Sequence, residues 1–87
     1  MEIEIRGEKY FLIWNYSVQL SNLGERDVTI CTLKKEGIPV ASGVTVRNPK
    51  DAFVKETARK QSLRAVLKSI GLDASERKQV WDAYRSR

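Results

Sequence analysis

The strongest constraint on the fold is a stretch of alternating side chains in the first quarter of the chain. From Lys9 to Ser21, every even position carries an apolar or aromatic side chain, namely Tyr10, Leu12, Trp14, Tyr16, Val18 and Leu20. A period of two held over eleven residues is typical of a β-strand. The odd positions begin apolar, at Phe11 and Ile13, and then become polar. We therefore predict a long strand whose first part is covered on both faces.

Three shorter segments around it also predict strands. Residues 1–6 alternate apolar and charged side chains, residues 28–35 are rich in β-branched side chains, and residues 38–47 place Ile38, Val40, Val44 and Val46 on one face. The polar residues 22–27 predict a connection, and Gly7-Glu8 and Glu36-Gly37 predict turns, because glycine adopts the positive φ that hairpin loops require. Pro39 favours an edge position, since it has no N–H for the ladder, and Gly43 suggests a bulge.

Residue 48 marks a change from strand to helix periodicity. Asn-Pro-Lys-Asp at 48–51 is a helix start signal, and the helix is expected to run to about Ile70 and end at Gly71. Asp73 and Glu76 have the spacing of a capping box, which predicts a second helix directly after the first. The two helices are therefore expected to form a tight αα-hairpin.

These elements predict an α+β fold: an antiparallel β-sheet of three to four strands followed by a C-terminal αα-hairpin packed on one face. We expect a single domain over residues 1–87, with a β-sheet part at 1–47 and a basic helical part at 48–87. The predicted inward residues of the sheet include Trp14, Val18, Ile30 and Val44. The predicted buried faces of the helices are Phe53, Leu63, Val66, Leu67 and Ile70 on the first, and Val80, Trp81 and Tyr84 on the second.

The residue inventory argues against catalysis. The chain of 87 residues has no His and one Cys, so it lacks the usual general base, the commonest metal ligand and any internal disulfide. It contains no glycine-rich phosphate loop and no nucleophile beside a base, and Cys31 is most simply a small buried apolar residue. We therefore expect no enzyme activity, no metal and no small-molecule cofactor.

The chain also lacks the features of a membrane or exported protein. No apolar run reaches the roughly 18 residues that a membrane-spanning helix needs. The first six residues are alternating and charged, which is unlike a signal peptide. A cytoplasmic location without membrane contact is the expectation.

Positive charge is concentrated in the second half of the chain. Residues 1–46 contain five Lys or Arg against six Asp or Glu, whereas residues 47–87 contain eleven against five. Such an asymmetry favours a polyanion, or an acidic protein surface, as partner. A solvated helical face that happens to be rich in Lys and Arg is the alternative.

The basic residues of the first predicted helix form two rows. Lys60, Arg64 and Lys68 are spaced four residues apart, which places them along one side of a helix about 6 Å from one another, and Lys55 and Arg59 form a second row. Arg77, Lys78, Arg85 and Arg87 could extend this patch, and Ser62 and Ser69 could donate hydrogen bonds to phosphate oxygens. No aromatic residue interleaves with the rows, which argues against a groove for stacking single-stranded bases.

A second candidate surface lies on the long strand. Phe11 and Ile13 face away from the predicted helices and could contact a partner protein, unless the N-terminal strand or a chain end covers them. The oligomeric state stays open, because Pro39 discourages pairing at one edge while the N-terminal strand could still join a second copy.

The helical part also resembles a known group of proteins. Asn-Pro-Lys-Asp, Ala-Arg-Lys-Gln-Ser-Leu-Arg-Ala-Val-Leu and Glu-Arg-Lys-Gln-Val-Trp-Asp-Ala-Tyr, all within residues 48–84, resemble small accessory proteins of tailed phages, in which Gly often stands at the position of Ala58. The resemblance implies a phage-encoded protein that binds a host machine or its nucleic acid in the host cytoplasm.

Two functions follow as hypotheses. In the first, the protein contacts nucleic-acid phosphates through its basic helix. In the second, it is an inhibitor of a host machine, of the anti-defence or anti-CRISPR kind, that docks on an acidic protein through the basic face or through Phe11 and Ile13.

Overall fold

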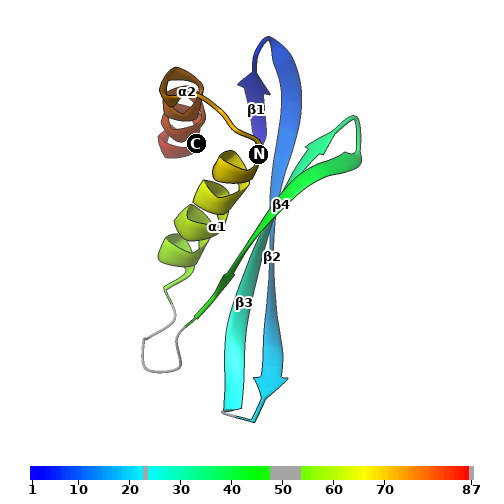
Figure 1. Cartoon of the computed structure of the whole chain (residues 1–87), viewed down its shortest axis with the longest axis vertical. Coiled ribbons are helices and arrows are strands. Elements are labelled where there is room, and N and C mark those ends of the chain that lie inside the picture. Colours follow the sequence, from blue (N-terminus) through cyan, green and yellow to red (C-terminus); the bar gives the residue numbers. More distant parts are fainter. Residues whose placement is uncertain (23, 48–53, 87) are drawn as a thin grey trace.

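The computed structural model describes residues 1–22, 24–47 and 54–86, which form one antiparallel sheet with two helices on one face (Figure 1). The elements are β1 (Glu2–Ile5), β2 (Glu8–Ser21), β3 (Gly24–Lys35), β4 (Ile38–Val46), α1 (Lys55–Ser69) and α2 (Ala74–Arg85). The strands lie in the order β1-β2-β3-β4, so each pairs with its neighbour in sequence. The predicted α+β fold is confirmed.

Two of the strand connections are two-residue turns with left-handed backbone angles. Glu36 and Gly37 have φ of 53° and 79°, and Arg6 and Gly7 have φ of 54° and 77°. Turns with positive φ at both central residues match the right-handed twist of the strands that they join. The turn predicted at Glu36-Gly37 is confirmed, whereas the first turn centres on Arg6-Gly7, one residue earlier than predicted.

The β2–β3 hairpin is longer than the sequence pattern indicates. Gly24 already pairs with Ser21, and the ladder continues through Arg26 opposite Gln19 and Asp27 opposite Val18. The loop predicted over residues 22–27 is therefore mostly strand. Ladder hydrogen bonds use only the backbone, so polar side chains are compatible with strand where both faces meet solvent.

The register corrects part of the predicted core. Trp14 pairs with Cys31, and Cys31 pairs with Gly43, so these three share the face under the helices. Ile30 and Val44 pair with each other on the opposite face, and the prediction that they point inward was wrong. Paired residues of neighbouring strands lie on one face, and only the register decides which face that is.

Gly43 has a packing role rather than a bulge. A Cβ atom at this position would lie 2.7 Å from the backbone nitrogen of Val66, so a side chain would collide with α1. The bulge is instead at Val40, where the pairing shifts between Leu33 and Lys34. The extra residue turns Ile38 to the face opposite that of Val44, so the predicted common face of β4 is interrupted. Pro39 does lie in an edge strand, as predicted.

The two helices cover different parts of the same sheet face. α1 packs on β3 and β4, and α2 packs on β1 (Figure 1). The core that they enclose consists of Ile3, Ile5, Leu12, Cys31, Leu33, Leu63, Val66, Leu67, Leu72, Val80 and Tyr84. The predicted inner faces of both helices are thus largely confirmed, with Ile70 and Trp81 partly buried at the margin.

The helix boundaries agree with the prediction at the end of α1 and at the start of α2. Gly71 follows α1 with φ of 66°, and the capping box of α2 forms, with Glu76 N–H donating to Asp73 at 2.8 Å and Asp73 N–H donating to Glu76 at 3.0 Å. α1 begins at Lys55, because Val54 before it is extended. The start signal predicted at residues 48–51 and the predicted core residue Phe53 lie outside the described residues.

Candidate nucleic-acid interface

The first row of basic residues follows the solvent side of α1. Lys60, Arg64 and Lys68 are all exposed, because the opposite side of the helix buries Leu63 and Leu67 against the sheet. Among the described residues, no carboxylate lies within 4.0 Å of any of these three charged groups. Their charge is therefore available to a partner.

The second helix adds cations to the same surface. Arg77 lines a shallow groove of about 220 Å³ together with Arg64, Lys68, Leu67 and Trp81. Since Arg77 and Trp81 come from α2 and the others from α1, the groove lies between the helices. The fold thus joins one row on α1 to a cation on α2 around an indole ring.

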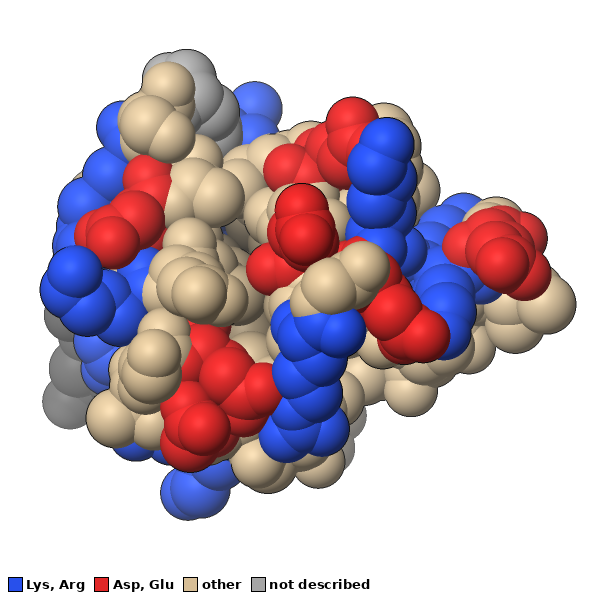
Figure 2. All heavy atoms as spheres, turned by 90° about the horizontal axis from the view of Figure 1, so that it is seen from above, with Lys and Arg blue, Asp and Glu red and all other residues tan. Residues whose placement is uncertain are grey.

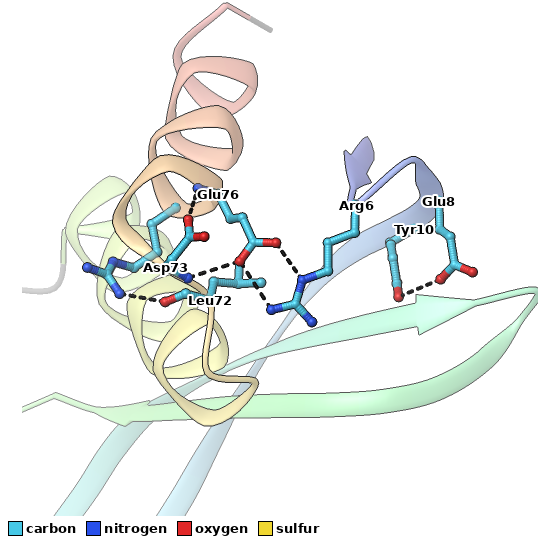
Figure 3. Close-up of polar contacts among 7 residues, drawn as sticks. Arg6, Glu8, Tyr10, Leu72, Asp73 and Glu76 are labelled. Atoms are coloured by element: carbon cyan, nitrogen blue, oxygen red, sulfur yellow. Dashed lines mark hydrogen bonds and ion pairs between the residues drawn. The ribbon is translucent and has the colours of Figure 1, made fainter.

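Local contacts fix where α2 begins and so where Arg77 lies. Arg77 donates from Nη1 to the carbonyl of Leu72 at 2.7 Å, and Glu76 forms a two-point ion pair with Arg6 of the β1–β2 turn (Figure 3). The hydrogen bond from Arg6 lowers the pKa of Glu76, and its reciprocal effect raises the pKa of Arg6. These contacts anchor the first turn of α2 to the end of the sheet.

A neighbouring hollow extends the surface toward the end of α2. Glu56, Lys60, Tyr84 and Arg85 line it. The carboxylate of Glu56 accepts a hydrogen bond of 2.8 Å from the Tyr84 hydroxyl. Arg85 lies 6.0 Å from the centre of the Trp81 ring and 3.7 Å from a carboxylate oxygen of Asp82, so its charge is partly neutralised. We define Lys60, Arg64, Lys68, Arg77 and Arg85 as the basic face.

The second row on α1 is engaged with the sheet. Lys55 lies 4.8 Å from the centre of the Tyr16 ring, and the Arg59 guanidinium lies 4.9 Å from the centre of Trp14. Arg59 Nε is buried and has no hydrogen-bond partner within the described part of the chain. Cation–π contacts of this kind contribute about 0.5–1 kcal/mol at exposed sites. Lys55 and Arg59 are therefore engaged with aromatic rings of the sheet, whereas Lys60, Arg64 and Lys68 have no ion pair or cation–π contact within the described chain.

Several of the remaining predicted site residues also have contacts within the fold. Lys78 is exposed but forms an ion pair of 3.4 Å with Asp82. Ser62 is fully buried and donates to the carbonyl of Ala58 at 2.9 Å, so the prediction that it contacts phosphate was wrong. Ser69 is exposed, but its hydroxyl donates to the carbonyl of Val66 at 2.8 Å. Arg87 lies outside the described residues.

Aromatic rings lie closer to the cations than the sequence suggests. The prediction that no aromatic residue interleaves with the basic rows was wrong, because Trp14, Tyr16 and Trp81 each lie beside a Lys or Arg. For Trp81 a signal was present: Arg77, Trp81 and Arg85 are spaced four residues apart on α2. For Trp14 and Tyr16 no local signal exists, since the pairing depends on how α1 crosses the sheet.

The distribution of charge over the surface is uneven. Figure 2 shows Lys and Arg gathered along the margin on the side of the helices, whereas acidic and basic groups are mixed over the end of the sheet. On the strands, ion pairs neutralise some of the charges, including Lys35 with Glu8 at 2.7 Å and Lys9 with Glu2 at 3.6 Å. The hydrogen bond from Lys35 also lowers the pKa of Glu8.

The face of the sheet away from the helices carries a second candidate surface. Phe11 is 51% exposed and Ile13 is partly exposed, so neither is fully covered by the described chain. The register adds further apolar residues to the two that the sequence indicates. We define the outer sheet face as Phe11, Ile13, Ile30, Val44 and Val46; Val28 lies on the same face but is buried.

Two features of the described residues bear on metal binding and on thiol chemistry. They contain no group of three or more His, Cys, Asp or Glu side chains able to hold a metal ion. Cys31 is fully buried, and its burial raises the pKa of the thiol to about 12, which keeps it protonated at neutral pH. Across residues 1–22, 24–47 and 54–86, no helix has the length and apolar character needed to cross a membrane.

Comparison with known proteins gives no relatives. No protein-family model, no curated protein and no solved structure matches this chain. Functional inference therefore depends on the residues and geometry described above.

Proposed function

We propose that this is a non-enzymatic accessory protein of the phage type that residues 48–84 resemble, and that it contacts nucleic-acid phosphates through the basic face. The observation that carries the proposal is the convergence of α1 and α2, which places Arg64, Lys68 and Arg77 around one groove. Phosphate contacts need several cations in one surface that are not neutralised by nearby carboxylates. Lys60, Arg64 and Lys68 meet that condition within the described chain.

The arrangement favours contact with a backbone over reading of bases. Residues spaced i, i+4 and i+8 rise about 6 Å per step along α1, a spacing that can follow successive phosphates. α1 packs on the sheet along its length, so it does not project as a recognition helix that enters a groove. We therefore expect binding that depends on shape and charge with little sequence preference.

The proposal is tested by fluorescence anisotropy with duplex DNA, duplex RNA and single strands, titrated with salt. If all five cations of the basic face neutralise phosphates, log K should fall with log salt at a slope of about −4.5 on duplex DNA. Replacing Lys60, Arg64 and Lys68 by Gln should reduce this slope by about 2.7 and weaken binding at every salt concentration.

A matched control separates position from net charge. The control variant carries Lys9→Gln, Lys34→Gln and Lys35→Gln, which also remove three positive charges, but from the far ends of β2 and β3. The two triple variants therefore have the same formal charge. This control should bind within about twofold of the wild type at one salt concentration, a small change on the free-energy scale. Equal weakening by both triple variants, or no binding at low salt, would contradict the proposal.

A second candidate function is supported by the outer sheet face. Val44 and Val46 are 54% and 44% exposed on the same sheet face as Phe11, but in the rows of Asn15 and Ser17 further along β2. Exposed apolar side chains that share one face can mark a surface for a partner protein. We infer from it the alternative of an inhibitor that docks on a host protein. Binding to such a protein should be lost in Ile13→Lys and retained when Lys60, Arg64 and Lys68 are replaced by Gln. The reverse pattern would assign that partner to the basic face.

A further inference from the structure

One edge of the sheet is open over half the length of a strand. β1 pairs with β2 only from Glu8 to Phe11, and the ladder ends where Met1 and Leu12 exchange hydrogen bonds of 2.8 and 2.9 Å. Beyond that point β2 continues to Ser21, paired with β3 on its other side. Figure 1 shows no described strand or helix alongside this lower half of β2. The open edge therefore begins at Ile13.

The backbone groups that point out of this edge can be assigned from the pairing. Leu12 directs both its N–H and its C=O toward β1, and the register of β2 against β3 is unbroken. In an antiparallel strand this direction repeats every second residue. Trp14, Tyr16, Val18 and Leu20 therefore present their backbone donors and acceptors at the open edge, where no described residue hydrogen-bonds to them.

The open edge lacks the features that usually protect a sheet edge. No charged residue, and no Pro, occurs between Lys9 and Glu25, although 31% of the whole chain is charged. The other edge, β4, carries Pro39 and a bulge. Charges, Pro and bulges are the common means of preventing strands from pairing at an edge. These protective features are present at the β4 edge and absent from the β2 edge, which indicates that the β2 edge is paired.

The side chains along the edge also match such pairing. Val18 and Leu20 are 56% and 77% exposed on the helix-bearing face, further along β2 than Tyr16, which is 40% exposed and lies beside Lys55 at the start of α1. Asn15, Ser17 and Gln19 on the other face are polar and uncharged. A strand added at the edge would bury part of the apolar row and leave the polar row in solvent.

We propose that a second copy of this chain pairs antiparallel along residues 14–20 of β2, across a two-fold axis perpendicular to the sheet. The two four-stranded sheets would then form one continuous antiparallel sheet. Identity of the partner follows from the charge pattern. Around such an axis, residues 14–20 of one copy face residues 14–20 of the other, so a charged residue in this segment would lie close to the same charge on the other copy. An edge that pairs with a different protein is free to carry charges complementary to those of that protein.

This assembly has a consequence for the helices. An antiparallel continuation preserves the two faces of the sheet, so both copies of α1 and α2 would lie on one side. Two cations lie on that side next to the edge: Lys55 over the ring of Tyr16 and Arg59 over the ring of Trp14. Pairing of the two copies would bring these cations together. The proposal nevertheless rests on the strand edge and stands whether or not the basic face binds nucleic acid.

The test is the mass in solution, by sedimentation or light scattering at about 100 μM, where a micromolar dimer would be largely assembled. The wild type should have twice the chain mass of 10.0 kDa. Val18→Lys should be monomeric, because it places two like charges on either side of the two-fold axis at Ser17, each opposite Tyr16 of the other copy. Val44→Lys is the matched control, since Val44 is 54% exposed on the other face of β4, and it should remain dimeric. A monomeric wild type, or a dimer abolished by Val44→Lys and retained in Val18→Lys, would overturn the proposal.

Hydrogen exchange on the wild type gives a test that needs no variant to fold. The amides of Tyr16, Val18 and Leu20 should exchange more slowly as the protein concentration rises, because they donate to the second copy only in the dimer. Exchange at these amides that is fast at every concentration would contradict the proposed pairing.

Discussion

At the scale of single residues, Gly43 is the position where side-chain volume matters most. Any Cβ would lie 2.7 Å from Val66 N and 2.8 Å from Ala65 Cβ, so α1 would have to move away from the sheet. We expect Gly43→Ala to lower the free energy of unfolding by about 1–3 kcal/mol. Ser42→Ala, a neighbour exposed on the outer face, should change it by less than about 0.5 kcal/mol. Urea denaturation measures the free energy of unfolding of both variants. Equal stability of the two variants would contradict the close packing of Gly43 against α1.

The single cysteine provides a second prediction at this scale. Cys31 is fully buried and the pKa of its thiol is about 12, so almost no thiolate is present at pH 8. A thiol reagent should therefore react with the folded protein only as fast as the protein opens, and at the rate of a free thiol in denaturant. Rapid reaction of the native protein would show that Cys31 is accessible.

At the scale of elements, the Arg6–Glu76 ion pair predicts how α2 responds to pH. The ion pair lowers the pKa of Glu76 from 4.5, so its stabilising contribution is complete above that value and is lost as the pH falls through the lower, folded-state pKa. Glu76→Gln removes the charge but keeps an acceptor for the capping box. Wild type and variant should therefore differ in stability at pH 7, and the difference should shrink as the pH falls from 4.5 through the lowered folded-state pKa of Glu76. A difference that is the same at every pH, down to full protonation of the carboxylates, would contradict this assignment.

The same scale shows which parts of the structure the sequence determines. Period two in β2, the Glu36-Gly37 turn, the capping box at Asp73 and the Gly71 terminus are local features, and each was predictable. The register of β3 and β4 depends on long-range pairing, so the sequence does not predict which face of the sheet carries Ile30 and Val44. The site divides likewise: helix spacing indicates the row on α1, whereas the groove with Arg77 requires the tertiary arrangement of α1 and α2.

At the scale of the whole molecule, the sheet and the helices present different chemistry. One side carries unneutralised cations on two helices, the opposite side carries apolar side chains, and one strand edge carries neither charge nor Pro. A small binding protein with separate surfaces can associate with itself through one and engage a partner through another.

The central claim, that nucleic acid contacts the basic face, is tested most directly by a ¹⁵N–¹H NMR titration with a short duplex. The account predicts shifts concentrated at Lys60, Arg64, Lys68, Arg77 and the indole N–H of Trp81, weakening as salt is raised. Amides of the outer sheet face should not move. No shifts on α1 and α2, or shifts largest at Phe11, Ile13 and Val44, would contradict the claim.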